Sequence, residues 1–228
     1  MTTLRLFAGQ SHSIPASTSW YLADLSEFRG KQELYTRQSP QRLKALREHA
    51  MIESAVSSNR IEGVSVEPSR VRELLVAPKP LFRDRDEEEV RGYRDALTLL
   101  HKKAGHLPLN EATVLNLHRL TRGKIWDAGQ YKEKDGDIIE RYADGRERVR
   151  FRTVPALETP DTLRKLLEDW QNVLDERWIH PLIALAAFNL DFLCIHPFRD
   201  GRNVSMTLRH LPCEFREAFF RSRPSWVD

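Results

Sequence analysis

The feature that most constrains the fold is an apolar segment, Pro181 to Ile195, that ends at a His-Pro pair. Residues of this segment are apolar nearly all round a helix, which predicts a buried central helix of a bundle. Pro197 lacks a backbone N–H and clashes with the preceding turn, so the helix must end at His196. The sequence therefore predicts a helical core whose main helix leads directly into a polar turn.

Apolar residues at helical spacing predict the remaining helices. The ranges are residues 40–58, 68–77, 84–100, 111–122 and 159–174. Pro40 suits a first helical turn, Asn110 suits an N-cap, and Gly63 and Gly123 suit helix ends. Between about residues 129 and 155, polar and apolar residues alternate around Asp144-Gly145, which predicts a β-hairpin. The predicted fold is all-α with one β-hairpin, preceded by a polar arm at residues 1–38.

Composition excludes several classes of protein. The 228 residues hold 36 Lys and Arg against 33 Asp and Glu, and the formal charge of +3 is too small to argue for nucleic acid. Cys194 and Cys213 are too few for a disulfide framework, which favours a reducing compartment. The first residues make a poor signal peptide, and no stretch reaches the roughly 18 apolar residues of a membrane helix. We expect a soluble, cytoplasmic protein without membrane contact.

The polar turn after the central helix groups residues that suit phosphoryl-type transfer. His196 can accept a hydroxyl proton near neutral pH, and Asp200 is a hard oxygen ligand suited to Mg²⁺. The chain then turns at Gly201 and can start a new helix near Asn203, where unpaired N–H groups attract a phosphate. Arg202 would add charge-assisted contacts. A histidine that only caps a helix end is the plain alternative for this position.

The segment His196-Pro197-Phe198-Arg199-Asp200-Gly201 resembles the signature of the Fic (Fido) family, His-Pro-Phe-x-Asp/Glu-Gly-Asn-Gly-Arg-x-x-Arg. Residues 90–97 look like an early core helix of that family, and residues 126–131 look like the lead into its hairpin "flap". The resemblance covers roughly residues 40–205. It implies a Fic-like helical bundle that transfers AMP from ATP to protein hydroxyl groups, with His196 as base and Phe198 as core anchor. Asp200 would be the Mg²⁺ ligand, and Gly201 and its neighbours would form the anion hole.

A second motif lies upstream of the core. Ser58, Glu62 and Gly63 match the family's inhibitory pattern Ser/Thr-x-x-x-Glu-Gly/Asn, and the first two lie four residues apart on one helix face. The resemblance implies that Glu62 pairs with the last signature arginine and blocks placement of the ATP γ-phosphate. Taken alone, this spacing also occurs by chance on surface helices.

The second half of the signature departs from the family pattern. Arg202 and Asn203 stand in the opposite order, one residue is missing, and Arg209 is the nearest substitute for the final arginine. Deleting one residue from a helix start rotates every later side chain by about 100°. Pro212 then interrupts the segment where the family has a leucine-rich helix. We hypothesise that residues after about Ser205 are a truncated or frameshifted end.

These observations divide the chain into four parts: an N-terminal arm (1–38), a helical segment with the inhibitory helix (39–78), a Fic core (79–211) and a divergent tail (212–228). The first functional hypothesis is an autoinhibited protein adenylyltransferase. Its cofactors would be ATP and Mg²⁺, bound with the help of Gly201, Arg202, Asn203 and Arg209, and its target protein would lie along the flap. The alternatives are an impaired remnant that only binds nucleotide or protein, and a Fic enzyme with another nucleotide donor.

Five arginines in the hairpin (Arg141, Arg146, Arg148, Arg150 and Arg152) could suggest nucleic acid. Because Glu140 and Glu147 are interspersed with them, a solvated strand face is the favoured interpretation. The sequence leaves the oligomeric state open, with a homodimer among the options.

Overall fold

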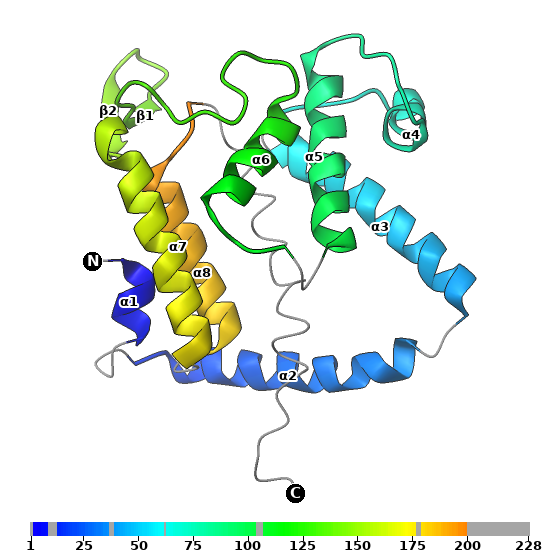
Figure 1. Cartoon of the computed structure of the whole chain (residues 1–228), viewed down its shortest axis with the longest axis horizontal. Helices are drawn as coiled ribbons and strands as arrows, with labels where there is room; N and C mark the ends of the chain where they lie inside the picture. Colours follow the sequence, from blue (N-terminus) through cyan, green and yellow to red (C-terminus); the bar gives the residue numbers. More distant parts are fainter. Residues whose placement is uncertain are drawn as a thin grey trace, which may run out of the picture.

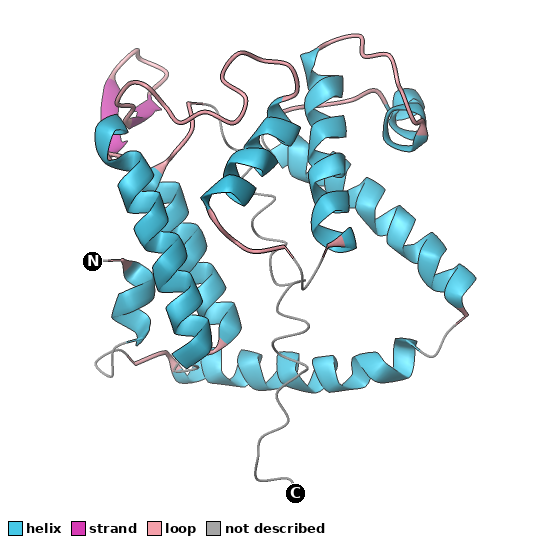
Figure 2. Ribbon diagram, in the orientation of Figure 1, coloured by secondary structure: helices cyan, strands magenta, loops and turns pink. Residues whose placement is uncertain are grey.

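Helices form nearly all of the regular structure, and the strands form a single two-stranded hairpin (Figures 1 and 2). The computed structural model describes residues 2–8, 13–36, 39–61, 63–103, 107–176 and 179–199. In these ranges the elements are α1 (Thr3–Ala8), α2 (Ala16–Thr36), α3 (Pro40–Ile61), α4 (Pro68–Val76), α5 (Arg85–Lys102), α6 (Glu111–Arg122), β1 (Ile138–Arg141), β2 (Glu147–Phe151), a 3-10 turn (Ala156–Glu158), α7 (Thr159–Glu176) and α8 (Pro181–Ile195). The predicted all-α fold with one hairpin is confirmed. None of the helices in the described ranges is long and apolar enough to cross a bilayer.

Helix ends follow the capping residues of the sequence. Asp84 and Asn110 each accept a hydrogen bond from the backbone N–H three residues later, at 2.9 Å, and so cap α5 and α6. Gly123 ends α6 with a positive φ of 65°. Helix α3 continues to Ile61, one turn beyond the predicted end, before Gly63 turns the chain with a φ of 84°.

The main core lies between α1, α5, α6, α7 and α8, and α8 contributes one face to it. Its buried apolar residues there are Ala184, Ala187, Phe188, Phe192 and Ile195. Leu182, Leu190 and Leu193 are 38%, 50% and 41% exposed. The expectation of a helix buried on all sides is therefore right for one face of α8 only.

The described residues of the predicted polar arm, 2–8 and 13–36, contain the two helices α1 and α2. Helix α1 packs on α7 and α8 (Figure 1), and Leu4 is fully buried in the main core. The backbone N–H groups of Thr3 and Leu4 donate to the two carboxylate oxygens of Asp191 at 2.9 and 3.0 Å. Arg5 binds the buried Asp169 of α7 at 2.9 Å. Sequence periodicity missed α1 because six residues are too short to display a helical pattern.

A second apolar cluster joins α3, α4 and α5. Its buried members are Ala55, Leu74, Leu75, Val90, Tyr93 and Leu97. Helix α5 belongs to both cores, because its other buried residues Ala96 and Leu100 face the main core. Gly92 lets α5 approach α6 closely: a Cβ atom added there would lie 2.2 Å from the Leu120 carbonyl oxygen.

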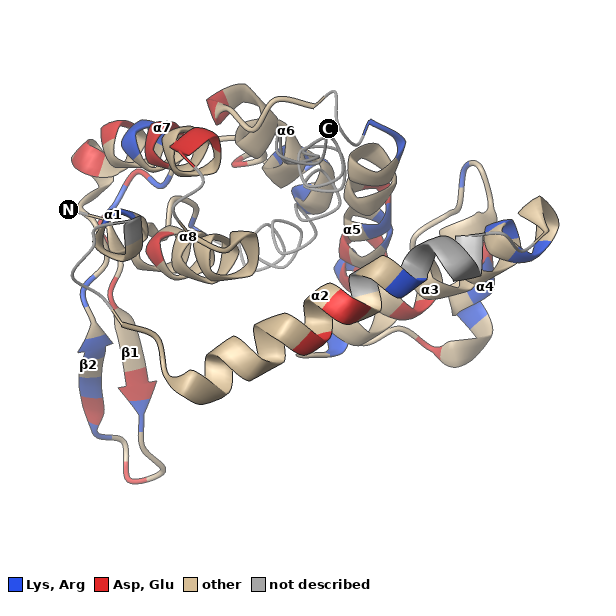
Figure 3. Cartoon of the chain, turned by 90° about the horizontal axis from the view of Figure 1, so that it is seen from below, with Lys and Arg blue, Asp and Glu red and all other residues tan. Residues whose placement is uncertain are grey.

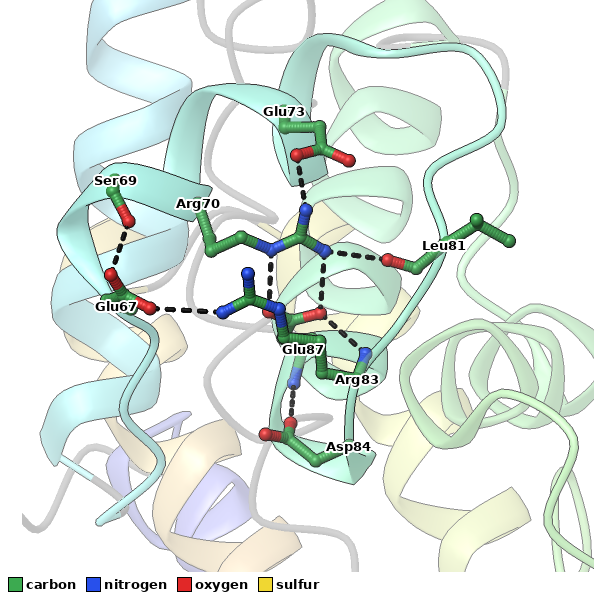
Figure 4. A network of polar contacts seen from close by, with 8 residues as sticks. All are labelled: Glu67, Ser69, Arg70, Glu73, Leu81, Arg83, Asp84 and Glu87. Atoms are coloured by element: carbon green, nitrogen blue, oxygen red, sulfur yellow. Dashed lines mark hydrogen bonds and ion pairs between the residues drawn. The ribbon is translucent and has the colours of Figure 1, made fainter.

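A polar network fastens α4 to the start of α5 (Figure 4). The carboxylate of Glu87, which is 4% exposed, accepts two hydrogen bonds from the Arg70 guanidinium, both at 3.1 Å. It also accepts the backbone N–H of Arg83 at 2.8 Å. Arg70 donates further to Glu73 and to the Leu81 carbonyl. Hydrogen bonding from Arg70 holds the pKa of Glu87 below its usual value, against the opposing effect of burial.

The hairpin projects from the helical body (Figure 3). Strands β1 and β2 are antiparallel, with Glu140 opposite Arg148 and a register irregularity between Ile138 and Ile139. Three of its arginines have acidic partners: Arg141 with Glu147 at 2.8 Å, Arg146 with Asp144 at 2.7 Å and Arg150 with Glu140 at 3.6 Å. These pairs agree with the solvated strand face that the charge pattern favours.

We predict that Gly92→Ala destabilises the protein by about 1–3 kcal/mol, because the added methyl group meets backbone that can yield only by separating α5 from α6. Gly30→Ala is the matched control, since Gly30 lies inside α2 with nothing within 4 Å of an added Cβ. That exchange should raise the free energy of unfolding by about 0.5–1 kcal/mol. Urea unfolding followed by circular dichroism measures both, and equal effects of the two exchanges would contradict the close approach at Gly92.

We predict that Glu87→Gln lowers the melting temperature at pH 7 and that this difference from the wild type shrinks in acid. A carboxyl group with a lowered pKa in the folded state stabilises the fold above its ordinary pKa of 4.5, and this stabilisation is lost as pH falls through the folded-state value. Glu73→Gln is the control, because Glu73 binds the same arginine but its side chain is 53% exposed. Melting curves between pH 3 and 7 check the prediction, which fails if the Glu87→Gln difference is independent of pH.

Candidate functional site

His196 is the residue at which α8 ends, as the sequence predicts, and its backbone is left-handed. Its φ and ψ are 48° and 64°, and in the described part of the chain no other non-glycine residue has a positive φ. Its backbone N–H still donates to the Phe192 carbonyl oxygen at 3.0 Å. A non-glycine residue in this region costs about 1–2 kcal/mol. Contacts from neighbouring segments must therefore hold the turn.

Lys132 contacts the carbonyl groups on both sides of His196. Its backbone N–H donates to the Pro197 carbonyl oxygen at 2.9 Å, and its Nζ donates to the Ile195 carbonyl oxygen at 3.1 Å. The same Nζ donates to Oγ1 of Thr153 at 2.9 Å. One residue thus connects the end of α8 with the segment that follows β2.

The ammonium group of Lys132 lies at the C-terminal end of α8, where unpaired carbonyl groups favour a cation. Its side chain is almost fully enclosed, since the residue is 6% exposed. Burial lowers the pKa of Lys132 below its usual value, and the charges of Asp135 and Asp137 oppose that shift. The Ile195 carbonyl and the Thr153 hydroxyl therefore help to compensate a buried charge.

Phe198 anchors the turn in the main core, in keeping with the role that the family resemblance implies. It is 1% exposed, and its ring stacks on the His118 ring of α6 at 3.9 Å between centroids with an interplanar angle of 11°. The Tyr131 ring lies nearly parallel at 6.1 Å, and Phe192 packs at 6.4 Å. The Tyr131 hydroxyl donates to Glu111 at 2.8 Å. An aromatic cluster from α6, α8 and the following loop thus fixes the residue two positions after His196.

The loop between α6 and β1 is tied to α6 at two further points. The backbone N–H of Gly129 donates to Nδ1 of the buried His118 at 3.0 Å, so Nδ1 of His118 acts as an acceptor. The guanidinium of Arg122 binds both carboxylate oxygens of Asp127 at 3.1 Å, and both residues are buried. These bonds place Lys132 opposite the end of α8.

Arg199 is the last residue of the signature that the structure describes. Its guanidinium lies 5.6 Å from the centre of the Trp126 ring, and Trp126 is 61% exposed. This contact is a cation–π pair on the surface beside the histidine turn. It joins the signature to the loop that leads into the hairpin.

The other signature residues lie outside the described ranges, namely Asp200, Gly201, Arg202, Asn203 and Arg209. Their predicted roles in Mg²⁺ and phosphate binding stay predictions. Within the described ranges, no group of three or more His, Cys, Asp and Glu side chains could hold a metal ion. The chemistry of the predicted donors still suits the ligands, because a carboxylate suits Mg²⁺ and arginine suits phosphate.

Of the predicted inhibitory residues, the structure describes Ser58 and Gly63, while Glu62 lies outside the described ranges. Ser58 is buried in the last turns of α3, and its Oγ accepts a hydrogen bond from the Tyr93 hydroxyl of α5 at 3.2 Å. Gly63 is exposed, and its N–H donates to the Arg60 carbonyl oxygen at 3.0 Å. Ser58 thus fastens the end of α3 to α5, the helix that both apolar clusters share.

Two residues of the site were not identified from the sequence. His118 lies among apolar residues at helical spacing, and this pattern is a signal from which its place on the buried face of α6 could be predicted. Lys132 has no such signal, since its neighbours Lys134 and Asp135 are exposed and charged.

Comparison with known proteins finds a family model that matches the region of this site. The sequence profile of the Fic/DOC family matches residues 108–205, a range that includes α6, the hairpin, α7, α8 and His196. No curated protein matches the chain in a sequence search.

Three solved structures share the fold. A Fic domain containing signaling protein from Bacteroides thetaiotaomicron has a TM-score of 0.71 at 21% identity, over 83% of this chain and 72% of that protein. A Fic family protein from Desulfovibrio desulfuricans has a TM-score of 0.65 at 23% identity, over 90% of this chain and 59% of the other. A glutamate-to-glycine variant of Fic-1 from C. elegans has a TM-score of 0.61 at 18% identity, over 95% of this chain and 66% of the other. Residues 108–205 therefore match the Fic/DOC family model, and the chain has a Fic-like helical fold.

Proposed function

We propose that the chain is a protein adenylyltransferase that transfers AMP from ATP to a hydroxyl side chain of a target protein and is restrained by its own Glu62. The observation that carries this proposal is the position of His196. It stands at the end of a core helix, in a turn held by Lys132 and Phe198, inside the range that matches the Fic/DOC family. Members of that family commonly transfer AMP or a related nucleotidyl group.

In the proposed reaction, His196 removes the proton from the target hydroxyl group as its oxygen attacks the α-phosphorus of ATP. The new bond joins the hydroxyl oxygen to this phosphorus, and the bond to the β-phosphate bridging oxygen breaks. Pyrophosphate leaves, and the proton on His196 passes to solvent or to the leaving group. Asp200 would hold Mg²⁺, which when bound neutralises charge on the triphosphate. Arg202, Asn203 and Arg209 would bind the phosphate oxygens.

The restraint is assigned to the end of α3. The bond between Ser58 and Tyr93 fixes this helix end on α5, and an attached helix end supports a regulatory role for the motif that begins at Ser58. A carboxylate held near the triphosphate competes with it for arginine. The C. elegans relative carries a glutamate-to-glycine exchange, and the corresponding test in this chain is Glu62→Gly.

A second candidate is favoured by the altered signature. With Arg202 and Asn203 in the opposite order, phosphate contacts can be misdirected, and the chain would then act as a nucleotide- or protein-binding remnant. A Fic enzyme with another nucleotide donor is a third outcome, because the signature does not fix the base.

We predict that Glu62→Gly raises label transfer from [α-³²P]ATP to protein in a lysate by about tenfold or more, in the range of typical regulatory couplings. Adding His196→Ala should then reduce transfer by about 100-fold or more, as for the loss of a general base. Glu48→Gly is the matched control, since it makes the same exchange at an exposed position of α3 and should leave transfer at the wild-type level.

The label decides between the hypotheses. Transfer from [α-³²P]ATP but not from [γ-³²P]ATP supports AMP transfer, and transfer from UTP alone supports the third candidate. A folded Glu62→Gly protein that labels nothing with any nucleotide contradicts the adenylyltransferase and favours the remnant. Activation by Glu48→Gly as strong as that by Glu62→Gly would contradict the specific role of Glu62.

A further inference from the structure

We infer that Lys132 is a positioning residue for His196, and that it couples the placement of the hairpin to the placement of this histidine. The expected effect on the reaction rate rests on the proposed role of His196 as the base. The structural part of the inference rests on contacts of the described residues alone.

The first argument is the backbone geometry of the histidine turn. A left-handed His196 is disfavoured without outside support. Lys132 bonds the carbonyl group before His196 through Nζ and the carbonyl group after it through its backbone N–H, at 3.1 and 2.9 Å. The first bond fixes the peptide plane that joins Ile195 to His196, and the second fixes the plane that joins Pro197 to Phe198. Because the proline ring also fixes φ of Pro197, little freedom is left for His196 between these two anchored planes.

The second argument is the position of Lys132 relative to the hairpin. Lys132 precedes β1, and Thr153 follows β2, so the bond between Nζ and Oγ1 of Thr153 closes the base of the hairpin. Thr153 in turn donates to the Gly136 carbonyl oxygen at 2.6 Å on the other side of that base. A displacement of the hairpin base therefore acts on the same ammonium group that holds Ile195.

The third argument is the cost of moving that ammonium group. Lys132 is 6% exposed, and a buried cation that loses its acceptors has no water to replace them. The two acceptors of the ammonium group belong to α8 and to the segment after β2, and the backbone N–H of the same residue binds the histidine turn at Pro197. The end of α8, the histidine turn and the segment after β2 are consequently coupled in their movement.

The test uses three variants of the full chain in the Glu62→Gly background. Lys132→Met keeps the backbone N–H and the side-chain length but removes the ammonium group, and Lys132→Arg keeps a cationic donor. Lys134→Met makes the first exchange at an exposed lysine of the same loop. Hydrogen exchange of the backbone amides at residues 129–136, 150–154 and 192–199 measures the turn and the hairpin base, and steady-state AMP transfer gives kcat and the KM for ATP.

We expect Lys132→Met to remain folded and to speed amide exchange in all three segments by about tenfold or more, the effect of losing a charge-assisted hydrogen bond. We expect kcat to fall by about tenfold or more with little change in KM, because the base is misplaced while nucleotide binding is kept. Lys132→Arg should recover most of both losses, and Lys134→Met should behave as its parent.

Three results would overturn the inference. The first is unchanged exchange in Lys132→Met at the histidine turn or at the hairpin base. The second is a fall in kcat that Lys134→Met reproduces. The third is loss of the whole fold in Lys132→Met, which would make Lys132 a general core residue instead of a positioning residue. If the Glu62→Gly parent transfers no label at all, the proposed function fails, and the exchange data still decide whether Lys132 holds the turn.

Discussion

The buried ammonium group of Lys132 is the contact on which the arrangement of the site depends. It lies where three chain segments meet that are remote in sequence: the loop after α6, the end of α8 and the residues after β2. A charge in such an enclosed place is tolerated only where its donors are satisfied, so these segments are held to one geometry. The histidine turn is held in this geometry through the carbonyl groups of Ile195 and Pro197, the residues before and after His196.

Helix α5 plays the corresponding role for the upstream half of the molecule. Its residues enter both apolar clusters, Gly92 allows close contact with α6, and Tyr93 bonds Ser58 at the end of α3. The helix that carries the predicted inhibitory motif is therefore attached to the core through one rigid neighbour.

The sequence predicts those features of the fold that are encoded locally. The bounds of α8, the cap Asn110 and the hairpin turn at Asp144-Gly145 all follow from residues within a few positions of the feature they determine. Features made by distant contacts were not predictable in this way. Helix α1 is stabilised by a hydrogen bond to Asp191, 188 residues beyond Thr3. The buried ammonium group of Lys132 donates to a carbonyl group 63 residues away.

The same distinction applies to the site. His196 and Phe198 were identifiable because the signature is contiguous, whereas the residues that hold them in place, His118 and Lys132, belong to other segments. A contiguous motif thus identifies candidate residues but not the contacts that position them.

Helix α8 explains how the N-terminal residues bear on the histidine turn. The start of α8 is capped by His180, whose Nδ1 accepts a hydrogen bond from the Leu182 N–H at 3.3 Å. Further along, Asp191 bonds the helix to α1, and Lys132 holds its C-terminal end. Asp191 lies five residues before His196 on the same helix, about one and a half turns away. Because an α-helix transmits displacement along its axis, the docking of α1 and the closure of the hairpin base both constrain where His196 stands.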